Sequence, residues 1–248
     1  MRIHFVLVIF GLTVAHLFSP ALFSQASAPT QTAKKTPDLS GIWMPGGGMG
    51  GGTAGRGFST DVPPLQSGAM EKYQANRAGL ANLNDKGLDD LDPNTYCYPP
   101  GAPRSMVMPY AFEIVQRPDI VYLLFEYNSG VRRIYLDGRK HPADVEPTWM
   151  GHSTGAWQGD TLVVDTVALR PETWLDPLGT PHSDALHIVE RFRRPSPDTL
   201  EVEFQFDDPK TFTKQWGGKR TYQLANTEIS EYIVCEEQLQ MGKSRELH

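Results

Sequence analysis

The chain has 248 residues, of which 40% are hydrophobic and 21% are charged, and its formal net charge is −6 at pH 7. A mildly acidic protein without a long basic run lacks the electrostatic footprint of nucleic-acid binding, so nucleic-acid and anionic-membrane partners are disfavoured. The length suits a single domain with a sizeable hydrophobic core.

Residues 1–28 have the layout of a secretory signal peptide. A basic start at Arg2 is followed by an apolar run and by a small-residue exit that ends Ala26-Ser27-Ala28. The apolar run is short for a bilayer span, and an uncleaved N-terminal anchor is the alternative interpretation. We therefore expect an exported protein, periplasmic or secreted, with no membrane span once the leader is removed.

Residues 29–60 are predicted to be a linker that carries the first strand, at 38–44, and a glycine-rich tract. The tract GGGMGGGTAGRG argues against fixed structure because of its backbone entropy. It could be taken for a phosphate-binding loop, but it lacks the Gly-Lys-Ser/Thr ending and does not lead from a strand into a helix. The body of the domain is expected at 61–248, and the first strand belongs to it.

A helix is predicted from Pro63 to about Leu80. Its apolar residues recur at helical spacing, and two prolines stand at its start, where a missing N–H costs least. We expect this amphipathic helix to pack on the rest of the domain.

From residue 112 onward the sequence has the texture of short strands separated by hairpin-length turns. Strands are expected at 112–115, 120–127, 131–136, 153–158, 161–167, 186–193, 200–206, 220–224 and 230–235. With the first strand this gives about ten strands and one helix, which predicts an all-β antiparallel barrel or sandwich. Closure into a barrel would remove the exposed strand edges.

Cys97 and Cys235 are the two cysteines of the chain. In an exported protein an even pair is most simply one disulfide, which would tie the loop around Cys97 to the last strand. Two buried free thiols are the alternative.

Several motifs together resemble a family of exported bacterial proteins that are mostly called hypothetical. The motifs are DLSGIW at 38–43, RIYLDGR at 133–139, GHS at 151–153, WQGDTLVV at 157–164 and HSD followed by ERF between 182 and 192. The resemblance covers nearly the whole mature chain and implies a secreted, calycin or lipocalin-like β-barrel, with no activity to carry over. The Gly41-x-Trp43 pair is similar to the one whose indole caps the core of true lipocalins.

Two loop ends carry the candidate acid/base residues. His152 precedes one expected strand, and His182 and Asp184 precede another. A histidine oriented by a carboxylate is the usual arrangement for general acid/base catalysis, and residues two apart in an extended segment point to the same side. The competing interpretation is that these residues are turn caps that bond to local backbone groups.

Trp174 and Asp176 lie in a connection that is too long for a plain hairpin, between 167 and 186. Long loops at a barrel mouth are where sites are built. If the loops share one rim, Asp176 would join the acid/base residues, and Trp149 and Trp174 would form apolar walls.

Metal binding and nucleophilic catalysis have weaker support. A catalytic zinc site needs three protein ligands, but HxH, HExxH and CxxC spacings are absent, so no metal site and no cofactor are predicted. The serines next to His152 and His182 should point away from them, and no Gly-x-Ser-x-Gly elbow is present. The metal-ligand candidates considered were His141, Asp144, His152, His182 and His187.

Glu190 is the odd polar residue on the apolar face of its strand, which it shares with Leu186, Ile188 and Phe192. A buried glutamate needs a partner. Arg133 or Arg132 is the expected partner, and an inward arginine could instead clamp a carboxylate ligand.

These patterns predict an exported β-barrel that binds a small apolar or aromatic molecule in its cavity, with His152, His182 and Asp184 as polar orienters. The alternative is a proton-transfer enzyme, an isomerase, lyase or hydrolase, with His182 as acid/base and Asp184 as its orienter. A scaffold protein of the cell envelope is the third hypothesis, and it has only the glycine tract in its favour.

Overall fold

The computed structural model describes residues 36–46, 57–83, 91–233 and 235. The predicted leader and most of the glycine tract lie outside these residues. Within the described part, no helix is long and apolar enough to cross a membrane.

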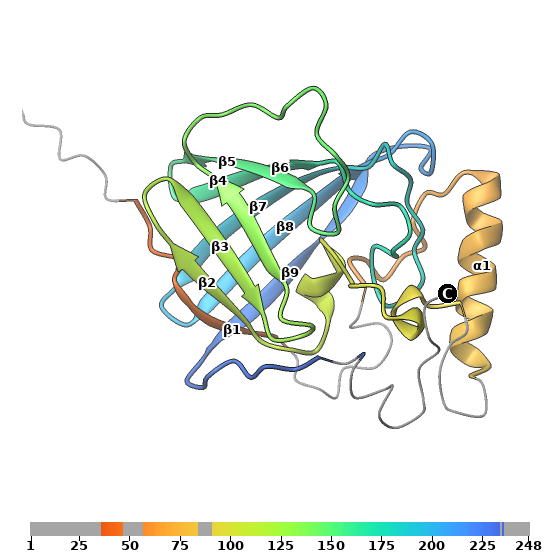
Figure 1. Cartoon of the computed structure of the whole chain (residues 1–248), viewed down its shortest axis with the longest axis horizontal. Coiled ribbons are helices and arrows are strands. Elements are labelled where there is room, and N and C mark those ends of the chain that lie inside the picture. The colour runs from red at the N-terminus through yellow and green to blue at the C-terminus, as the bar shows by residue number, and fades with distance from the viewer. Residues whose placement is uncertain (1–35, 47–56, 84–90, 234, 236–248) are drawn as a thin grey trace, which may run out of the picture. The chain divides into compact units, whose positions relative to one another are not determined.

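Nine strands in the described part form a closed barrel (Figure 1). Each strand pairs with the next in the chain, and the last closes on the first; all pairs are antiparallel except β4 with β5. The predicted all-β barrel is therefore confirmed. The strands are β1 (Gly41–Pro45), β2 (Phe112–Gln116), β3 (Ile120–Phe125), β4 (Val131–Tyr135), β5 (His152–Gln158), β6 (Thr161–Val167), β7 (His187–Ser196), β8 (Thr199–Asp207) and β9 (Trp216–Ala225).

Period-two alternation builds the barrel wall. In β8, Leu200, Val202, Phe204 and Phe206 are buried, and the residues between them face outward. In a strand, successive side chains point to opposite faces of the sheet, so such a pattern gives one core face and one outer face. The same rule divides the polar residues of β4 to β7 between the inside and the outside of the barrel.

Strand β9 starts at Trp216 rather than at the predicted residue 220, and Gly217 and Gly218 follow this first residue. A Cβ added at Gly218 would lie 1.6 Å from the backbone oxygen of Phe58. Glycine inside a strand marks such a close backbone approach, and it also interrupts the apolar alternation that sequence reasoning depends on.

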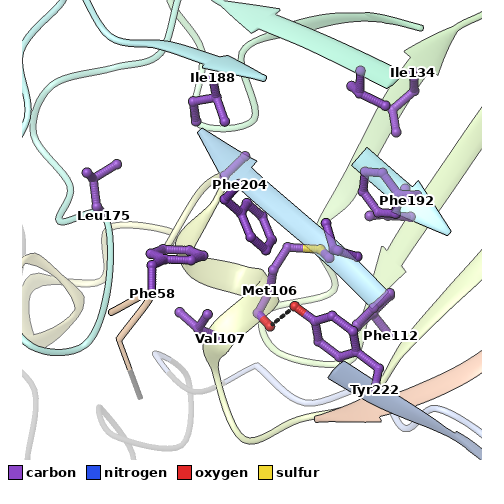
Figure 2. Packing of buried hydrophobic residues seen from close by; sticks show 14 of the residues in the cluster. Phe58, Met106, Val107, Phe112, Ile134, Leu175, Ile188, Phe192, Phe204 and Tyr222 are labelled. Atoms are coloured by element: carbon purple, nitrogen blue, oxygen red, sulfur yellow. Dashed lines mark hydrogen bonds between the residues drawn. The ribbon is translucent and has the colours of Figure 1, made fainter. Parts of the chain in front are cut away.

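Loop residues fill the barrel interior together with the strands (Figure 2). The ring of Phe58 lies 4.7 Å from that of Phe204, and Met106 lies in the short helix η3 (Arg104–Val107). The hydroxyl of Tyr222 donates a hydrogen bond of 2.9 Å to the Met106 carbonyl. Packed side chains thus occupy the barrel interior, where the sequence patterns predict a ligand cavity.

Trp43 lies in the core, as the Gly-x-Trp pair predicts. It is fully buried, and its Nε1 donates to the carbonyl of Leu39 at 3.0 Å. The guanidinium of Arg194 lies 5.0 Å from the centre of its ring. A cation over an indole adds to the burial of the ring.

Helix α1 (Ser67–Ala81) confirms the predicted helix. Met70 and Tyr73 pack against the core, and the side-chain amide of Asn76 donates to the Gly179 carbonyl at 2.8 Å. The helix is therefore held against the connection between β6 and β7. A second short helix, η2 (Pro93–Tyr96), leads to the predicted disulfide between Cys97 and Cys235, whose Cα atoms are 5.1 Å apart.

The prediction of a strand at 230–235 is wrong. Tyr232 instead forms an isolated parallel bridge with Tyr127. Because β1 pairs with both β2 and β9, the closed sheet has no free edge to accept a tenth strand.

Candidate functional site

His182 is enclosed in the connection between β6 and β7, with 8% of its surface exposed. Its Nδ1 donates to the carbonyl of Ser183 at 3.1 Å, and its Nε2 then accepts from the hydroxyl of Thr173 at 3.2 Å. Burial lowers the pKa of His182, although the Ser183 carbonyl and the charges of nearby carboxylates raise it. Both ring nitrogens are occupied, so this neutral imidazole has no nitrogen left for a substrate.

Asp184 is exposed and pairs with Lys210, whose Nζ lies 2.7 Å from its Oδ1. No hydrogen bond between described atoms joins it to His182, so the pair expected from sequence does not form. The same-side rule fails because Asp184 lies in a turn, not in an extended strand. The carboxylate that orders this segment is Asp208, which accepts from both the backbone N–H and the hydroxyl of Ser183 at 2.7 Å.

Asp176 lies in the wall of a cavity of about 290 Å³, here called the mouth pocket. The pocket is bounded by the segment before α1, by α1 itself, by the connection between β6 and β7 and by the first residue of β9. Its lining residues are Ser59, Thr60, Asp61, Val62, Pro63, Tyr73, Arg77, Asp176, Leu178, Thr180 and Trp216.

Asp176 is 2% exposed. Its Oδ1 accepts from the backbone N–H groups of Leu178 at 3.0 Å and Thr180 at 3.3 Å. Burial raises the pKa of Asp176, and these hydrogen bonds and the charge of Arg104 only partly offset the effect. Burial also raises the pKa of Tyr73 in the same wall. A carboxyl that is poorly solvated in this way favours a hydrogen-bonding partner over bulk water.

Trp216 also lines the mouth pocket. Its Nε1 is buried and has no acceptor within the described residues. Its ring packs against Phe206 and Phe212, with centres 4.9 and 5.3 Å apart. A buried donor without a partner costs about 1–3 kcal/mol.

Trp174, the other predicted wall, is packed away from the mouth pocket. It is 6% exposed, and the guanidinium of Arg104 lies 5.4 Å from its ring centre. Arg104 also binds both carboxylate oxygens of Asp92, at 2.8 and 2.6 Å. The contacts of Trp174 are therefore those of a structural residue.

His152 begins β5 on the outer face of the barrel and belongs to a group of four residues, here called the outer polar cluster. Its Nδ1 lies 2.7 Å from Nδ1 of His141. Nε2 of His141 lies 2.9 Å from Oδ1 of Asp165, and Nε2 of His187 lies 2.8 Å from Oδ2 of the same carboxylate. The four side chains thus form one continuous line of polar contacts across β5, β6 and β7.

The ring of His152 also faces an open space of about 330 Å³, here called the outer cleft. Trp149 lines this cleft, with the guanidinium of Arg170 4.3 Å from its ring centre. Burial lowers the pKa of His152, and electrostatic interactions with the neighbouring His141 and Arg139 side chains lower it further. The cleft is lined by Val131, Arg133, Tyr135, Thr148, Trp149, Met150, Gly151, His152 and Ser153.

Glu190 points into the barrel, as its strand parity predicts, and is 0% exposed. Its partner is Arg132, which contacts both carboxylate oxygens, one at 2.8 Å, and also bonds to Ser153 and Thr166. These four residues are called the inner polar cluster. Arg133 is not the partner of Glu190, because it has the opposite parity and lines the outer cleft.

Sequence reasoning missed that His141 contacts His152 and that Asp165 and His187 continue the same line of contacts. The signal was available in the hairpin between β5 and β6, where a turn at Gly159 pairs Gln158 with Thr161. Counting back along this register puts Asp165 opposite Thr154, on the face that also carries His152. Within the described residues, no group of three or more histidine, cysteine or acidic side chains is arranged to hold a metal ion.

Comparison of the sequence with protein-family models and with curated proteins found no match.

Proposed function

We propose that the protein is an exported β-barrel that binds a small aromatic molecule in its mouth pocket. The observation that carries the proposal is the buried carboxyl group of Asp176 in the wall of an open cavity. Concave sites that combine aromatic surface with a few placed polar groups are typical of small-molecule binding, and the mouth pocket has polar and apolar walls in about equal share. The Cys97–Cys235 disulfide supports an oxidising compartment, and the signal-peptide layout of residues 1–28 agrees with it.

The motifs shared with the exported bacterial family support membership in that family and a calycin-type barrel. The burial of Trp43 with Arg194 beside its ring agrees with the capping role of the Gly-x-Trp pair. The binding site proposed here lies outside the barrel interior, because packed side chains occupy that interior.

The lining of the mouth pocket defines the chemistry of the ligand. Tyr73 and Trp216 offer aromatic surface, and Arg77 offers a guanidinium that can pair with an anionic group. Asp176 accepts a hydrogen bond from a hydroxyl or an N–H. A volume of about 290 Å³ is at the lower end of ligand sites, so the ligand has about one ring.

A panel of benzoate derivatives tests this proposal, with 4-hydroxybenzoate as the first probe. Its ring suits the aromatic walls, its carboxylate suits Arg77 and its hydroxyl suits Asp176. Titration followed by tryptophan fluorescence should show saturable binding, and the signal should be lost in Trp216→Phe. Benzoate, which lacks the hydroxyl, should bind about tenfold more weakly, because a buried polar group is then left without its partner.

Matched variants separate the pocket from the surface of α1. Arg77→Ala and Asp176→Asn should each weaken 4-hydroxybenzoate binding, whereas Lys72→Ala should not, because Lys72 is exposed on the same helix and does not line the pocket. Equal affinities in all three variants, or no saturable binding by any benzoate of the panel, would overturn the proposal.

The alternative of a proton-transfer enzyme built on His182 and Asp184 has lost its geometric basis. His182 is closed by Thr173 and Ser183, and Asp184 is paired with Lys210. We do not propose that activity at the connection between β6 and β7.

A further inference from the structure

The protons of the outer polar cluster can be assigned from its contacts. A carboxylate only accepts hydrogen bonds, so Nε2 of His141 and Nε2 of His187 both donate to Asp165. When His141 is neutral, its Nδ1 carries a lone pair and accepts from Nδ1–H of His152. His152 therefore keeps its own lone pair on Nε2, to which no described residue donates.

We infer that His152 is a catalytic general base in the outer cleft and that His141 and Asp165 are its positioning residues. A general base needs a free lone pair, a fixed tautomer and a reachable substrate. His141 fixes the tautomer of His152, and stacking on Tyr135, with ring centres 5.5 Å apart, fixes the ring. This site shares no lining residue with the mouth pocket and is independent of the function proposed there.

The proton path is balanced within the cluster. Nε2 of His152 takes a proton from the substrate, and the proton on its Nδ1 moves to Nδ1 of His141. His141 becomes an imidazolium whose positive charge faces the carboxylate of Asp165, 2.9 Å away. The substrate is left as an anion and regains a proton at another atom when the path reverses. The net reaction is an isomerisation by proton transfer, which needs no oxidant, reductant or co-reactant.

The walls of the outer cleft indicate the class of substrate. Trp149 and Met150 provide apolar surface, and Arg133 provides a positive charge for the anion that forms. A cleft of about 330 Å³ accepts a molecule of one or two rings. The substrate class is therefore a small aromatic compound with an acidic C–H next to an electron-withdrawing group.

The general base can be tested with 5-nitrobenzisoxazole, an aromatic probe that opens when a base removes its C3 proton. The electrons of that C–H bond form the nitrile, the N–O bond breaks and a coloured phenolate is released. The whole protein should accelerate this ring opening above the buffer rate. His152→Ala should lose about 100-fold of that acceleration, the lower end for general-base catalysis because the cleft is open to water.

The positioning roles need a pH profile, because a structural role would change only the amount of folded protein. The midpoint of the fall in rate of the native protein should lie at a pH lower than 6.5, since the pKa of His152 is lowered from that value. Asp165→Asn should lower the rate plateau and move the fall in rate to lower pH, because the imidazolium of His141 then lacks the negative charge of Asp165. The charged and titratable groups around His152 are Arg133 and Tyr135 on β4, Arg139 and His141 in the following connection, Asp165 on β6 and His187 on β7.

Asp160→Asn is the matched control for Asp165→Asn, because Asp160 is an exposed aspartate in the turn of the same hairpin. It should leave both the rate and the pH profile unchanged. Histidine ¹⁵N chemical shifts give a readout that does not depend on the probe, with His152 protonated on Nδ1 and His141 on Nε2. The proposal is overturned if His152 is protonated on Nε2 at neutral pH, or if the His152→Ala protein opens the probe as fast as the native protein.

Discussion

Strands β4 to β7 carry a polar cluster on each side of the barrel wall, and the two clusters are built from adjacent residues. Ser153 belongs to the inner polar cluster and His152 to the outer one; Thr166 and Asp165 are divided in the same way. Alternation along a strand thus places two different chemistries about one residue apart.

The two clusters differ in whether all of their polar atoms have partners within the protein. Arg132 uses its guanidinium on Glu190, Ser153 and Thr166, and it is 1% exposed. The outer polar cluster is half-exposed and ends at His152, which lines the outer cleft. A closed and dry network stabilises one conformation, whereas a network with one open end can exchange a proton with a substrate.

The largest expected effect comes from breaking the inner polar cluster. Arg132→Met leaves the carboxylate of Glu190 buried without a counter-charge, which should lower the free energy of unfolding by about 3–5 kcal/mol. Urea denaturation followed by circular dichroism measures this loss.

The double variant Arg132→Met/Glu190→Leu separates the cost of an unpaired charge from the value of the pair. Replacing both partners of a buried ion pair by apolar residues is often neutral or stabilising, so the double variant should recover most of the stability. If it is as unstable as the single variant, the inner polar cluster contributes specific structure beyond charge compensation.

His182 differs from His152 in that both of its ring nitrogens have hydrogen-bond partners within the protein. Its pKa is lowered in the folded protein, chiefly by burial, so the unfolded chain takes up a proton first as the pH falls below 6.5. The stability that it contributes is therefore present above pH 6.5 and is lost as the pH falls through its folded pKa.

His182→Gln should flatten this pH dependence and should cost about 1–2 kcal/mol at pH 7, since the contacts with Thr173 and Ser183 are weakened. Urea denaturation at pH 7 and pH 5 tests both effects. If the free energy of unfolding changes between pH 7 and pH 5 by the same amount in the variant and in the native protein, the ring of His182 is accessible to water in solution.

Local rules were sufficient for much of the fold. Hairpin turns and alternation located most of the strands, and parity placed Glu190 inside the barrel. The spacing of apolar residues located α1, and the even cysteine count gave the Cys97–Cys235 disulfide. Each of these features depends on residues that are near in sequence or on a pair with no competitor.

The candidate site was harder to predict because it depends on the path of connections that have no regular secondary structure. The choice between Arg132 and Arg133 needed the exact start of β4, since a shift of one residue exchanges the two faces. His141 reaches His152 from a connection without regular structure, so no periodicity marks it. The pairing of His182 with Asp184 assumed an extended segment, but Asp184 lies in a turn.

Asp176 provides a smaller effect of opposite sign. Burial raises its pKa above the ordinary value of 3.8, so the unfolded chain ionises first as the pH rises. The free energy of unfolding should therefore fall as the pH rises from 3.8 through the folded pKa. Asp176→Asn cannot ionise and keeps an acceptor for Leu178 and Thr180, so its stability should fall less over the same range, measured by urea denaturation at pH 4 and pH 7.

The smallest effect on stability is expected in the outer polar cluster, which is the sharpest contrast with the inner one. The carboxylate of Asp165 is 43% exposed, so Asp165→Asn should change the free energy of unfolding by no more than about 1 kcal/mol, as exposed ion pairs do. Asp160→Asn in the same hairpin should change it equally little. A loss of several kcal/mol in Asp165→Asn, measured by urea denaturation, would make the outer polar cluster a second structural network. A small loss would mean that the line of histidines contributes little to stability. This is the result expected if these side chains are positioned for chemistry in the outer cleft.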